Sequence, residues 1–230
     1  MERGPEGFGQ EGYVGMSTAR DDILSAVRAA AAARRAVEEK MPPPAPLLPA
    51  RAMGSDGELR ARFCEMARFA GATVEGPVSR AAAPGAIAAF LSREALGDSL
   101  VLAPDPDLVS LPWRSVPRMQ VRPGLPEARD AVAVTGAVAG VAETGSLLVA
   151  SGARIANALH VLCETHIVLL RAAAICGSYE AALARLNRQA QPMPRAATFV
   201  TGPSRTADIE KTPQIGVHGP RRLHILLIDD

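Results

Sequence analysis

The sequence predicts an α/β protein with a mainly parallel β-sheet and helices on both of its faces. Short apolar, strand-like runs such as SLVLAP, THIVLL and LHILLID recur along the chain. Segments with helical periodicity, each of about 10 residues, separate these runs. Because a strand that pairs in parallel must be reached through a crossover, usually a helix, this alternation indicates a parallel sheet covered on both faces.

An N-terminal helical arm is expected ahead of that domain. Residues 1–15 are glycine-rich and without periodicity, which predicts a disordered tail or a translation start at Met16. An alanine-rich helix is expected over about 18–40. The proline-rich run MPPPAPLLPARAM that follows cannot lie inside a helix or a strand. We therefore predict a helix and linker over residues 16–52 and one α/β domain over residues 53–230.

The first elements of the domain have recognisable ends. Ser55 and Glu58 form a capping-box pattern that opens a helix, and ATVEG follows as a short strand. The next helix, PGAIAAFLSREALG, has Pro84 near its first turn and Gly97 just past its end. The run SLVLAP is then the next expected strand.

From residue 131 onward, strand-like and helical segments continue to alternate. AVAVTGAVAGVAETGSLLVAS predicts two β-rich runs around glycine-containing turns. ARIANALHVL is typical of a helix, THIVLL of a strand and SYEAALARLNRQ of a helix. ATFVT and LHILLID are expected to be the last two strands.

The composition argues against several classes of function. A formal net charge of +1 and an aromatic content of 3% offer no basis for binding nucleic acid through charge or stacking. No apolar run approaches the roughly 20 residues of a membrane span. The three cysteines, Cys64, Cys163 and Cys176, form no CxxC pair, which argues against a disulfide framework and against an iron–sulfur cluster held by this chain alone. A reducing cytoplasm is therefore the expected compartment, and no bound cofactor is expected in this chain alone.

Ligands of open α/β sheets bind beyond the carboxyl ends of the strands, and three loops are expected there. The first contains Glu143, Thr144, Gly145 and Ser146, which offer a carboxylate, two hydroxyls and an accessible backbone N–H. This combination suits a polar ligand held beside a carboxylate that acts as base or nucleophile. The same residues also fit a tight turn whose hydroxyls satisfy their own backbone.

The second loop follows the strand ATFVT and begins at Gly202. Ser204 is expected to cap a short helical turn. The backbone N–H groups of Arg205, Thr206 and Ala207, with the guanidinium of Arg205, would then form an anion-binding nest. Asp208 would fix Arg205 or cap locally. The alternative is an Arg–Asp pair that only clamps the loop.

The third loop, GVHGPRR, holds His218 beside Gly219 in a bent segment, which suits a proton carrier or a hydrogen-bond donor. A further pattern, His160, Cys163 and His166, has spacing like that of a metal site. That stretch runs from a helix through a turn into a strand, so its side chains are expected to diverge. We therefore predict no metal site.

The motifs VAETGSLLVAS and TGPSRTADIE…GVHGPRRLHILLID resemble the LUD domain of the lactate utilization protein C family. The resemblance extends over most of residues 17–230. It implies the NagB/RpiA/CoA transferase-like fold, which sugar-phosphate isomerases, coenzyme A transferases and 5-formyltetrahydrofolate cyclo-ligases share. It also implies a bacterial three-protein system that oxidises L-lactate to pyruvate, whose other two subunits carry cysteine-rich and iron–sulfur motifs.

The resemblance leaves different functions open. In the first, the chain is a non-catalytic or co-catalytic subunit whose C-terminal loops bind a small anionic metabolite or dock the iron–sulfur partner. In the second, it is a stand-alone enzyme of the coenzyme A transferase or cyclo-ligase type, with Glu143 as nucleophile or base and Arg205 as anion clamp. The turn Glu-Thr-Gly at Glu143 is similar to the Glu-Asn-Gly-like turn of a coenzyme A transferase, with Thr144 replacing the amide. In the third, the chain binds a metabolite for regulation.

Overall fold

The computed structural model describes residues 19–38, 48–152, 156–189, 193–207 and 213–229. The chain divides into two compact units, Met1–Leu47 and Leu48–Asp230. In the first, helix α1 spans Ala19–Glu38, which confirms the predicted alanine-rich helix. The expected tail over 1–15 and most of the proline-rich linker lie outside the described residues. No helix within the described ranges has the length and apolar character needed to cross a membrane.

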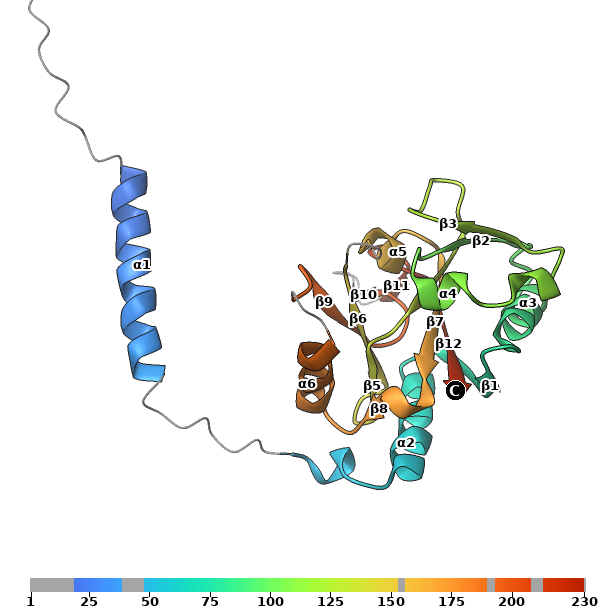
Figure 1. Cartoon of the computed structure of the whole chain (residues 1–230), viewed down its shortest axis with the longest axis horizontal. Helices are drawn as coiled ribbons and strands as arrows, with labels where there is room; N and C mark the ends of the chain where they lie inside the picture. The colour runs from blue at the N-terminus through green and yellow to red at the C-terminus, as the bar shows by residue number, and fades with distance from the viewer. Residues whose placement is uncertain (1–18, 39–47, 153–155, 190–192, 208–212, 230) are drawn as a thin grey trace, which may run out of the picture. The chain divides into compact units, whose positions relative to one another are not determined.

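Within the described part of the second unit, the main sheet has six strands, each parallel to its neighbours (Figure 1). In spatial order they are β1 (Thr73–Ser79), β12 (Arg222–Asp229), β7 (Thr165–Arg171), β4 (Val132–Gly136), β2 (Ser99–Leu102) and β3 (Gln120–Pro123). The chain leaves β2 toward the edge strand β3, whereas it leaves β4 in the opposite direction, toward β7 and then β12. The point at which the connections reverse therefore lies between β2 and β4.

Apolar side chains on the two faces of this sheet belong to two separate core clusters. Along β7, Ile167 and Leu169 join one cluster, whereas Val168 and Leu170 join the other. This alternation follows from the period of two residues in a strand. Both faces are therefore covered, which makes these strands continuous apolar runs in the sequence.

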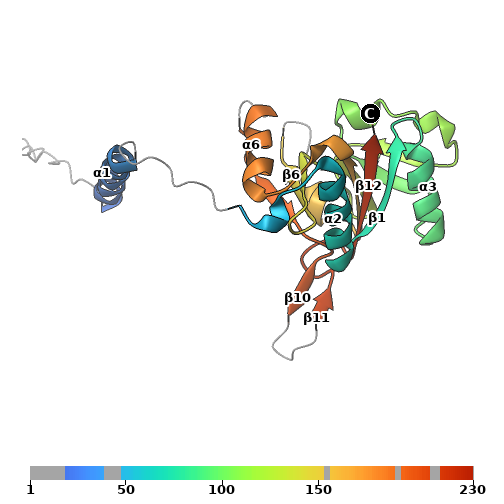
Figure 2. The same ribbon diagram turned by 90° about the horizontal axis from the view of Figure 1, so that it is seen from below.

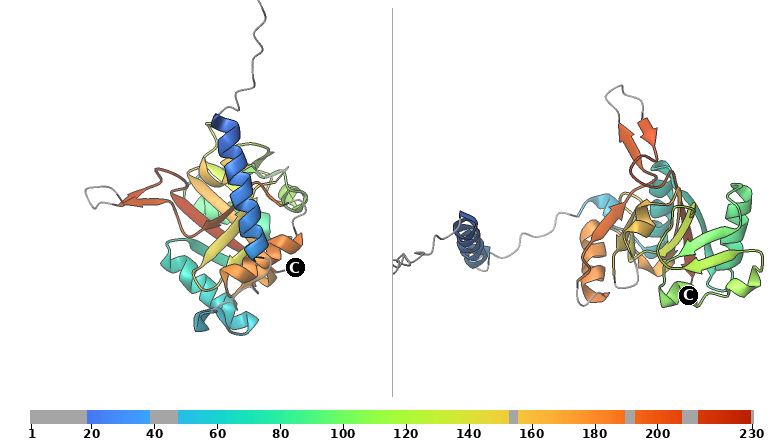
Figure 3. Two further views of the ribbon diagram at one scale, coloured as in Figure 1. Left: turned by 90° about the vertical axis from the view of Figure 1, so that its left-hand side faces the viewer. Right: turned by 90° about the horizontal axis from the view of Figure 1, so that it is seen from above.

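Helices lie on both faces, as predicted. Three helices contribute to the first cluster: α3 (Ala83–Arg93), α4 (Pro106–Val109) and α5 (Ala158–Val161). On the second face the cluster includes Phe63 and Ala67 of α2 (Asp56–Phe69). Helix α6 (Tyr179–Gln189) and α3 lie on opposite sides of the unit, with the sheets between them (Figures 2 and 3). Short 3₁₀ helices occur at Ala50–Ala52, Trp113–Ser115 and Ala172–Ala174.

A second sheet, which the sequence did not predict, covers part of the second face. Its four described strands run in the order β8 (Ile175–Cys176), β5 (Ala139–Val141), β6 (Ser146–Ala150) and β9 (Ala197–Val200). Strand β6 is antiparallel to both β5 and β9. The region after residue 131 thus holds three strands, β4, β5 and β6, in two sheets, where two runs were expected. Helix α6 packs against the second sheet through Ala182 and Leu186.

The segment after Ser204 is a strand and not the predicted helical turn. Strands β10 (Arg205–Ala207) and β11 (Pro213–Ile215) pair antiparallel and form a hairpin that projects from the unit (Figure 2). The backbone N–H of Gly216 donates to the carbonyl of Ser204, at 3.0 Å, and starts this pairing. The prediction failed because the partner strand, six to ten residues further along the chain, satisfies backbone groups that a local N-cap would otherwise serve.

The predicted helix ends are confirmed where local side chains decide them. The carboxylate of Glu58 accepts from the backbone N–H of Ser55 at 2.7 Å, and the Ser55 hydroxyl accepts from the N–H of Glu58 at 3.4 Å, so the capping box at α2 is complete. Pro84 lies in the first turn of α3. The helix predicted from ARIANALHVL is shorter than expected, because α5 covers only Ala158–Val161; part of that stretch, 153–155, is outside the described residues.

Candidate functional site

The six parallel strands give the main sheet a carboxyl edge and an amino edge. The segments that follow β1, β2, β4 and β7 lie at the carboxyl edge, and those that precede β4, β7 and β12 lie at the amino edge. Hydrogen bonds join the amino-edge segments: Thr165 N–H donates to Ala131 O at 2.9 Å, and Arg221 N–H donates to Glu164 O at 2.8 Å. In open α/β sheets, ligands bind at the carboxyl edge where the connections reverse.

Two of the three predicted ligand loops lie at the opposite edge from the one expected. The loop that contains His218 leads into β12, so it lies at the amino edge. The Ser204 loop lies beside it, because Ser204 N–H donates to Pro220 O at 2.9 Å. The prediction that these loops lie at the carboxyl ends of the main sheet is therefore wrong. Its cause is that ATFVT, the strand before Ser204, belongs to the second sheet.

A cavity of about 360 Å³ lies at the carboxyl edge of the main sheet. Its lining includes Asp105 after β2 and Gly136 at the end of β4, so it lies at the reversal between those strands. Arg80, Arg171 and Arg185 also line it. We call it the carboxyl-edge cavity. The sequence analysis missed it, although a signal was present: Arg80 directly follows one strand, and Arg171 ends another.

An ordered set of contacts holds the charged side chains of this cavity. The Asp107 carboxylate accepts from Arg171 at 2.8 Å, and its backbone carbonyl accepts from Arg80 at 2.7 Å. Asp105 caps α4 by accepting from Asp107 N–H at 2.9 Å. Asp107, in the first turn of α4, is therefore hydrogen-bonded both to Arg80 after β1 and to Arg171 at the end of β7.

Arg185 reaches the same cavity from α6. Its Nε is buried and has no hydrogen-bond partner among the described groups, and one of its terminal nitrogens donates to Ala173 O at 3.4 Å. A buried donor without an acceptor is costly, by about 1–3 kcal/mol in general. Three guanidinium groups against two carboxylates make this lining favourable for an anion.

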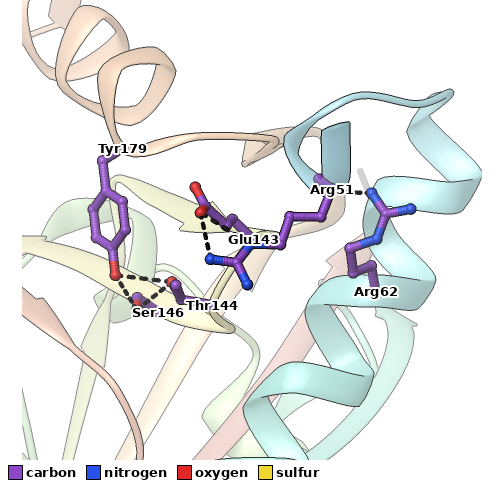
Figure 4. A network of polar contacts seen from close by, with 6 residues as sticks. All are labelled: Arg51, Arg62, Glu143, Thr144, Ser146 and Tyr179. Atoms are coloured by element: carbon purple, nitrogen blue, oxygen red, sulfur yellow. Dashed lines mark hydrogen bonds and ion pairs between the residues drawn. The ribbon is translucent and has the colours of Figure 1, made fainter. Parts of the chain in front are cut away.

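Glu143, the predicted catalytic carboxylate, lies in the turn between β5 and β6 and is held by an arginine (Figure 4). Its Oε1 accepts from Arg51 Nε at 3.1 Å and from a terminal nitrogen of Arg51 at 2.9 Å. Arg62 in turn donates to the backbone carbonyls of Arg51 and Met53. Glu143 does not line the carboxyl-edge cavity. Its catalytic role stays a prediction.

The hydroxyls beside Glu143 bond to one another within the protein (Figure 4). Thr144 Oγ1 lies 2.7 Å from Ser146 Oγ and 2.9 Å from the hydroxyl of Tyr179. Ser146 Oγ also lies 2.6 Å from Thr201 Oγ1, which joins this turn to the end of β9. These contacts link the second sheet to α6. A ligand-binding role for Thr144, Gly145 and Ser146 stays a prediction.

The loop from Gly202 to Thr206 packs on the end of α2. A Cβ on Gly202 would lie 2.1 Å from the carbonyl oxygen of Ala70, and the guanidinium of Arg205 lies against Gly71. With β10 in place of a helical turn, the expected helix N-terminus is absent from this described loop. Asp208, the expected partner of Arg205, lies outside the described residues. The ligand-binding role of Gly202, Ser204, Arg205 and Thr206 stays a prediction.

A second cavity, of about 430 Å³, lies at the amino edge. His218 and Gly219 line it together, as neighbours in the bent loop. Four large apolar side chains around it are exposed, and we call them the amino-edge patch: Val161, Leu162, Ile215 and Val217, at 47%, 68%, 51% and 57% exposure. Exposed apolar side chains that gather in one place are typical of interaction surfaces.

His160 and His166 lie closer together than the sequence predicted. Their ring centroids are 5.5 Å apart, and His166 Nε2 lies 2.8 Å from Thr135 Oγ1. Burial, followed by the neighbouring His160, lowers the pKa of His166 to about 3. Over the described ranges, no group of three or more His, Cys, Asp or Glu side chains is placed to hold a metal ion.

The fold is that of an α/β protein with a cavity at the reversal of its parallel sheet. The family model described as "LUD domain" matches residues 128–228. A lactate utilization protein C of Deinococcus radiodurans is 33% identical over 162 residues, covering 66% of this chain and 71% of the relative. The chain belongs to the LUD-domain family, which confirms the resemblance found in the sequence.

Other matches are shorter. A lactate utilization protein C of Bacillus pumilus is 37% identical over 93 residues, 39% of each protein. An uncharacterized protein of Escherichia coli K12 is 34% identical over 102 residues, 43% of this chain and 44% of that protein. The chain therefore covers only about two fifths of the length of these two relatives. The fold is also similar to the crystal structure of a DUF162 family protein from Deinococcus radiodurans, with a TM-score of 0.58 and 25% identity over 76% of this chain and 99% of the other.

Proposed function

We propose that this chain is a subunit of a cytoplasmic lactate-utilization system that supports the oxidation of L-lactate to pyruvate together with iron–sulfur and cysteine-rich partner proteins. The observation that carries the proposal is the similarity to a lactate utilization protein C over 162 residues. The three free cysteines are consistent with a reducing compartment.

The need for partners follows from the chemistry. Oxidation of lactate removes two electrons and two protons from its hydroxyl-bearing carbon and hydroxyl oxygen, so an electron acceptor must take part. In this chain Cys64 lies on α2, Cys163 after α5 and Cys176 on β8. Burial raises the pKa of all three thiols, that of Cys163 to about 11. Cluster ligands are thiolates, so this placement supports clusters held by partner proteins.

The amino-edge patch supports a docking role. Leu162 and Val217 are the most exposed of its four side chains, and they flank a cavity without belonging to the core. Burying such side chains against a partner contributes about 25 cal/mol per Å² of apolar surface removed from water, which offsets part of the entropic cost of association. We propose this patch as the contact for the iron–sulfur partner.

Affinity purification tests both parts of the proposal. The tagged chain, expressed at native level in its own cells grown on L-lactate, should recover iron–sulfur proteins in stoichiometric amounts. Leu162→Glu should lose them, because a carboxylate would be buried in an apolar contact. Leu125→Glu is the matched control, since Leu125 is 63% exposed and lies outside the patch.

Two outcomes would contradict the proposal. If the wild-type chain elutes alone, the subunit function is wrong for this protein, and a screen with coenzyme A esters and folates should follow, with Glu143→Gln as the diagnostic variant. If Leu162→Glu and Leu125→Glu both retain the partners, the docking surface lies elsewhere. The stand-alone enzyme would need Glu143 to act on a ligand, whereas its carboxylate is paired with Arg51 and lines neither cavity.

A further inference from the structure

The carboxyl-edge cavity brings together three arginines from separate parts of the chain. Arg80 follows β1, Arg171 ends β7 and Arg185 lies on α6. Like charges repel, so their common position at one cavity disfavours the folded state unless anionic groups offset them. The Asp107 carboxylate, which accepts from Arg171, offsets part of this charge, and the Asp107 backbone carbonyl accepts a hydrogen bond from Arg80.

Of the three arginines, Arg185 has the weakest set of hydrogen-bond acceptors among the described groups. Its Nε is buried and lacks an acceptor among the described groups, and the contact from its terminal nitrogen to Ala173 O is long, at 3.4 Å. A guanidinium presents a planar set of N–H donors that matches the two oxygens of a carboxylate or a phosphate. The oxygen of an anion in the cavity would supply the missing acceptor.

The rest of the lining leaves room for a small ligand. A Cβ added to Gly136, at the end of β4, would meet no atom within 4 Å, so the floor of the cavity is open there. Leu108, Leu169 and Ile228 contribute apolar wall. A volume of about 360 Å³ is near the lower end of the range for ligand sites, which suits a metabolite of a few carbons.

We propose that the carboxyl-edge cavity binds a small oxyanion, a carboxylate or a phosphate, through the guanidinium of Arg185, with Arg171 and Arg80 adding positive charge. Asp107 opposes this binding, because its carboxylate competes for Arg171 and repels the anion. The two groups therefore affect the affinity for the anion in opposite directions. Loss of Arg185 weakens binding, and loss of the Asp107 charge strengthens it. This inference does not depend on the proposed lactate function.

Isothermal titration calorimetry of the full chain at low ionic strength measures whether an anion binds this site. The two probes are sodium L-lactate and sodium phosphate, with sodium chloride of equal ionic strength as the control for screening. One saturable site is expected for at least one of the two oxyanions. Lactate binding would identify the ligand class as a carboxylate, and binding of phosphate alone would identify it as a phosphate.

Four variants locate the binding. Arg185→Ala should weaken it about tenfold or more, since it removes charge-assisted hydrogen bonds. Asp107→Asn, which keeps the backbone contacts, should strengthen it about fivefold. Gly136→Val should abolish it by filling the cavity where no atom obstructs the new side chain. Arg188→Ala, an exposed arginine on the same helix as Arg185, should leave it unchanged.

The proposal is overturned if neither oxyanion binds the wild-type chain saturably. It is also overturned if Arg185→Ala and Gly136→Val bind as the wild type does, with circular dichroism showing both folded. Because no partner is present in the titration, its failure would leave the purification result intact. Failure of the purification would likewise leave this site intact.

Discussion

His160, His166 and His224 are buried, whereas His218 is exposed at the amino edge. Burial lowers the pKa of each buried imidazole; His160 adds to the effect at His166, and Arg93 adds to it at His224, whose pKa falls to about 4. The Glu75 carboxylate lies 3.9 Å from His224 Nε2 and would favour its charged form, but burial outweighs it. These rings are therefore neutral in the folded protein near pH 7.

The buried histidines make stability depend on pH below neutrality. In the unfolded chain the pKa of an imidazole returns to about 6.5. As the pH falls from about 6.5 toward 4, the unfolded state binds protons that the folded state does not, so the free energy of unfolding falls. The expected slope is up to about 1.4 kcal/mol per pH unit for each of His166 and His224, and His160 adds to it in the same direction. Above pH 7 these residues should add no slope.

Urea unfolding at several values between pH 5 and 8 measures this slope. Because carboxylates also titrate in acid, the informative comparison is between variants. His224→Gln should reduce the slope by up to about 1.4 kcal/mol per pH unit, and Ser92→Ala, at an exposed position of α3, should leave it unchanged. Equal slopes for all three proteins would contradict the assignment of neutral buried rings.

Gly145 and Gly136 should differ strongly in how much the same substitution costs in stability. Gly145 has φ +68°, and a Cβ there would lie 2.1 Å from the backbone nitrogen of Ala67 on α2. Gly145→Ala should lower the free energy of unfolding by about 3 kcal/mol or more, because backbone on both sides must shift. Gly136→Ala, with open space at its Cβ, should change it by less than about 1 kcal/mol. Chemical denaturation of the pair checks this, and similar losses in both would contradict it.

Helix α2 is the element on which several distant segments rest. The turn at Gly145 packs on its last turn, at Met66 and Ala67, and the Gly202 loop packs just past its end, at Ala70. Arg62 on the same helix donates to backbone carbonyls of the segment that carries Arg51. The family motifs in the Glu143 turn and the Gly202 loop thus both contact the C-terminal end of this one helix.

The capping box of α2 should be measurable as stability. Ser55→Ala removes the acceptor for the Glu58 N–H and the hydroxyl that donates to the Glu58 carboxylate at 2.8 Å. The free energy of unfolding should fall by about 1 kcal/mol. Ser92→Ala, at an exposed position of α3, should have little effect in the same urea titration. A Ser55→Ala protein as stable as the wild type would show that packing alone positions α2.

The two units of the chain differ in how far their described side chains are buried. Leu48–Asp230 contains all three described core clusters, the Arg51–Glu143 pair and both cavities. In Met1–Leu47, the described side chains of α1 are mostly exposed, including Ile23 at 63% and Val27 at 57%. An apolar face of this kind is typical of a helix that binds another surface.

Removal of residues 1–47 tests the independence of the larger unit. The shortened chain should unfold within about 2 °C of the full chain, because its core clusters remain complete. It should also retain the oxyanion site. If α1 contributes to docking through its exposed apolar side chains, partner recovery should fall. A large drop in melting temperature, measured by differential scanning calorimetry, would show that the first unit stabilises the second.

The alternation of strands and helices, the α2 capping box and the LUD-domain motifs could be predicted because they depend on neighbours along the chain. Strand periodicity and N-cap chemistry act over a few residues, and each predicted strand of the main sheet is present. The β10–β11 hairpin and the second sheet could not be predicted in this way. Their backbone hydrogen bonds join segments that only the folded chain brings together.

The sequence by itself determined the α/β class, the main elements and the family of this protein. Only the tertiary structure decided which polar residues meet: Glu143 pairs with Arg51, the His218 loop lies at the amino edge, and Arg185 joins Arg171 at the carboxyl edge. The physical reason is that strand order and direction place each loop at one edge of the sheet. That order results from burying apolar faces over the whole chain, a requirement that no local stretch of sequence contains.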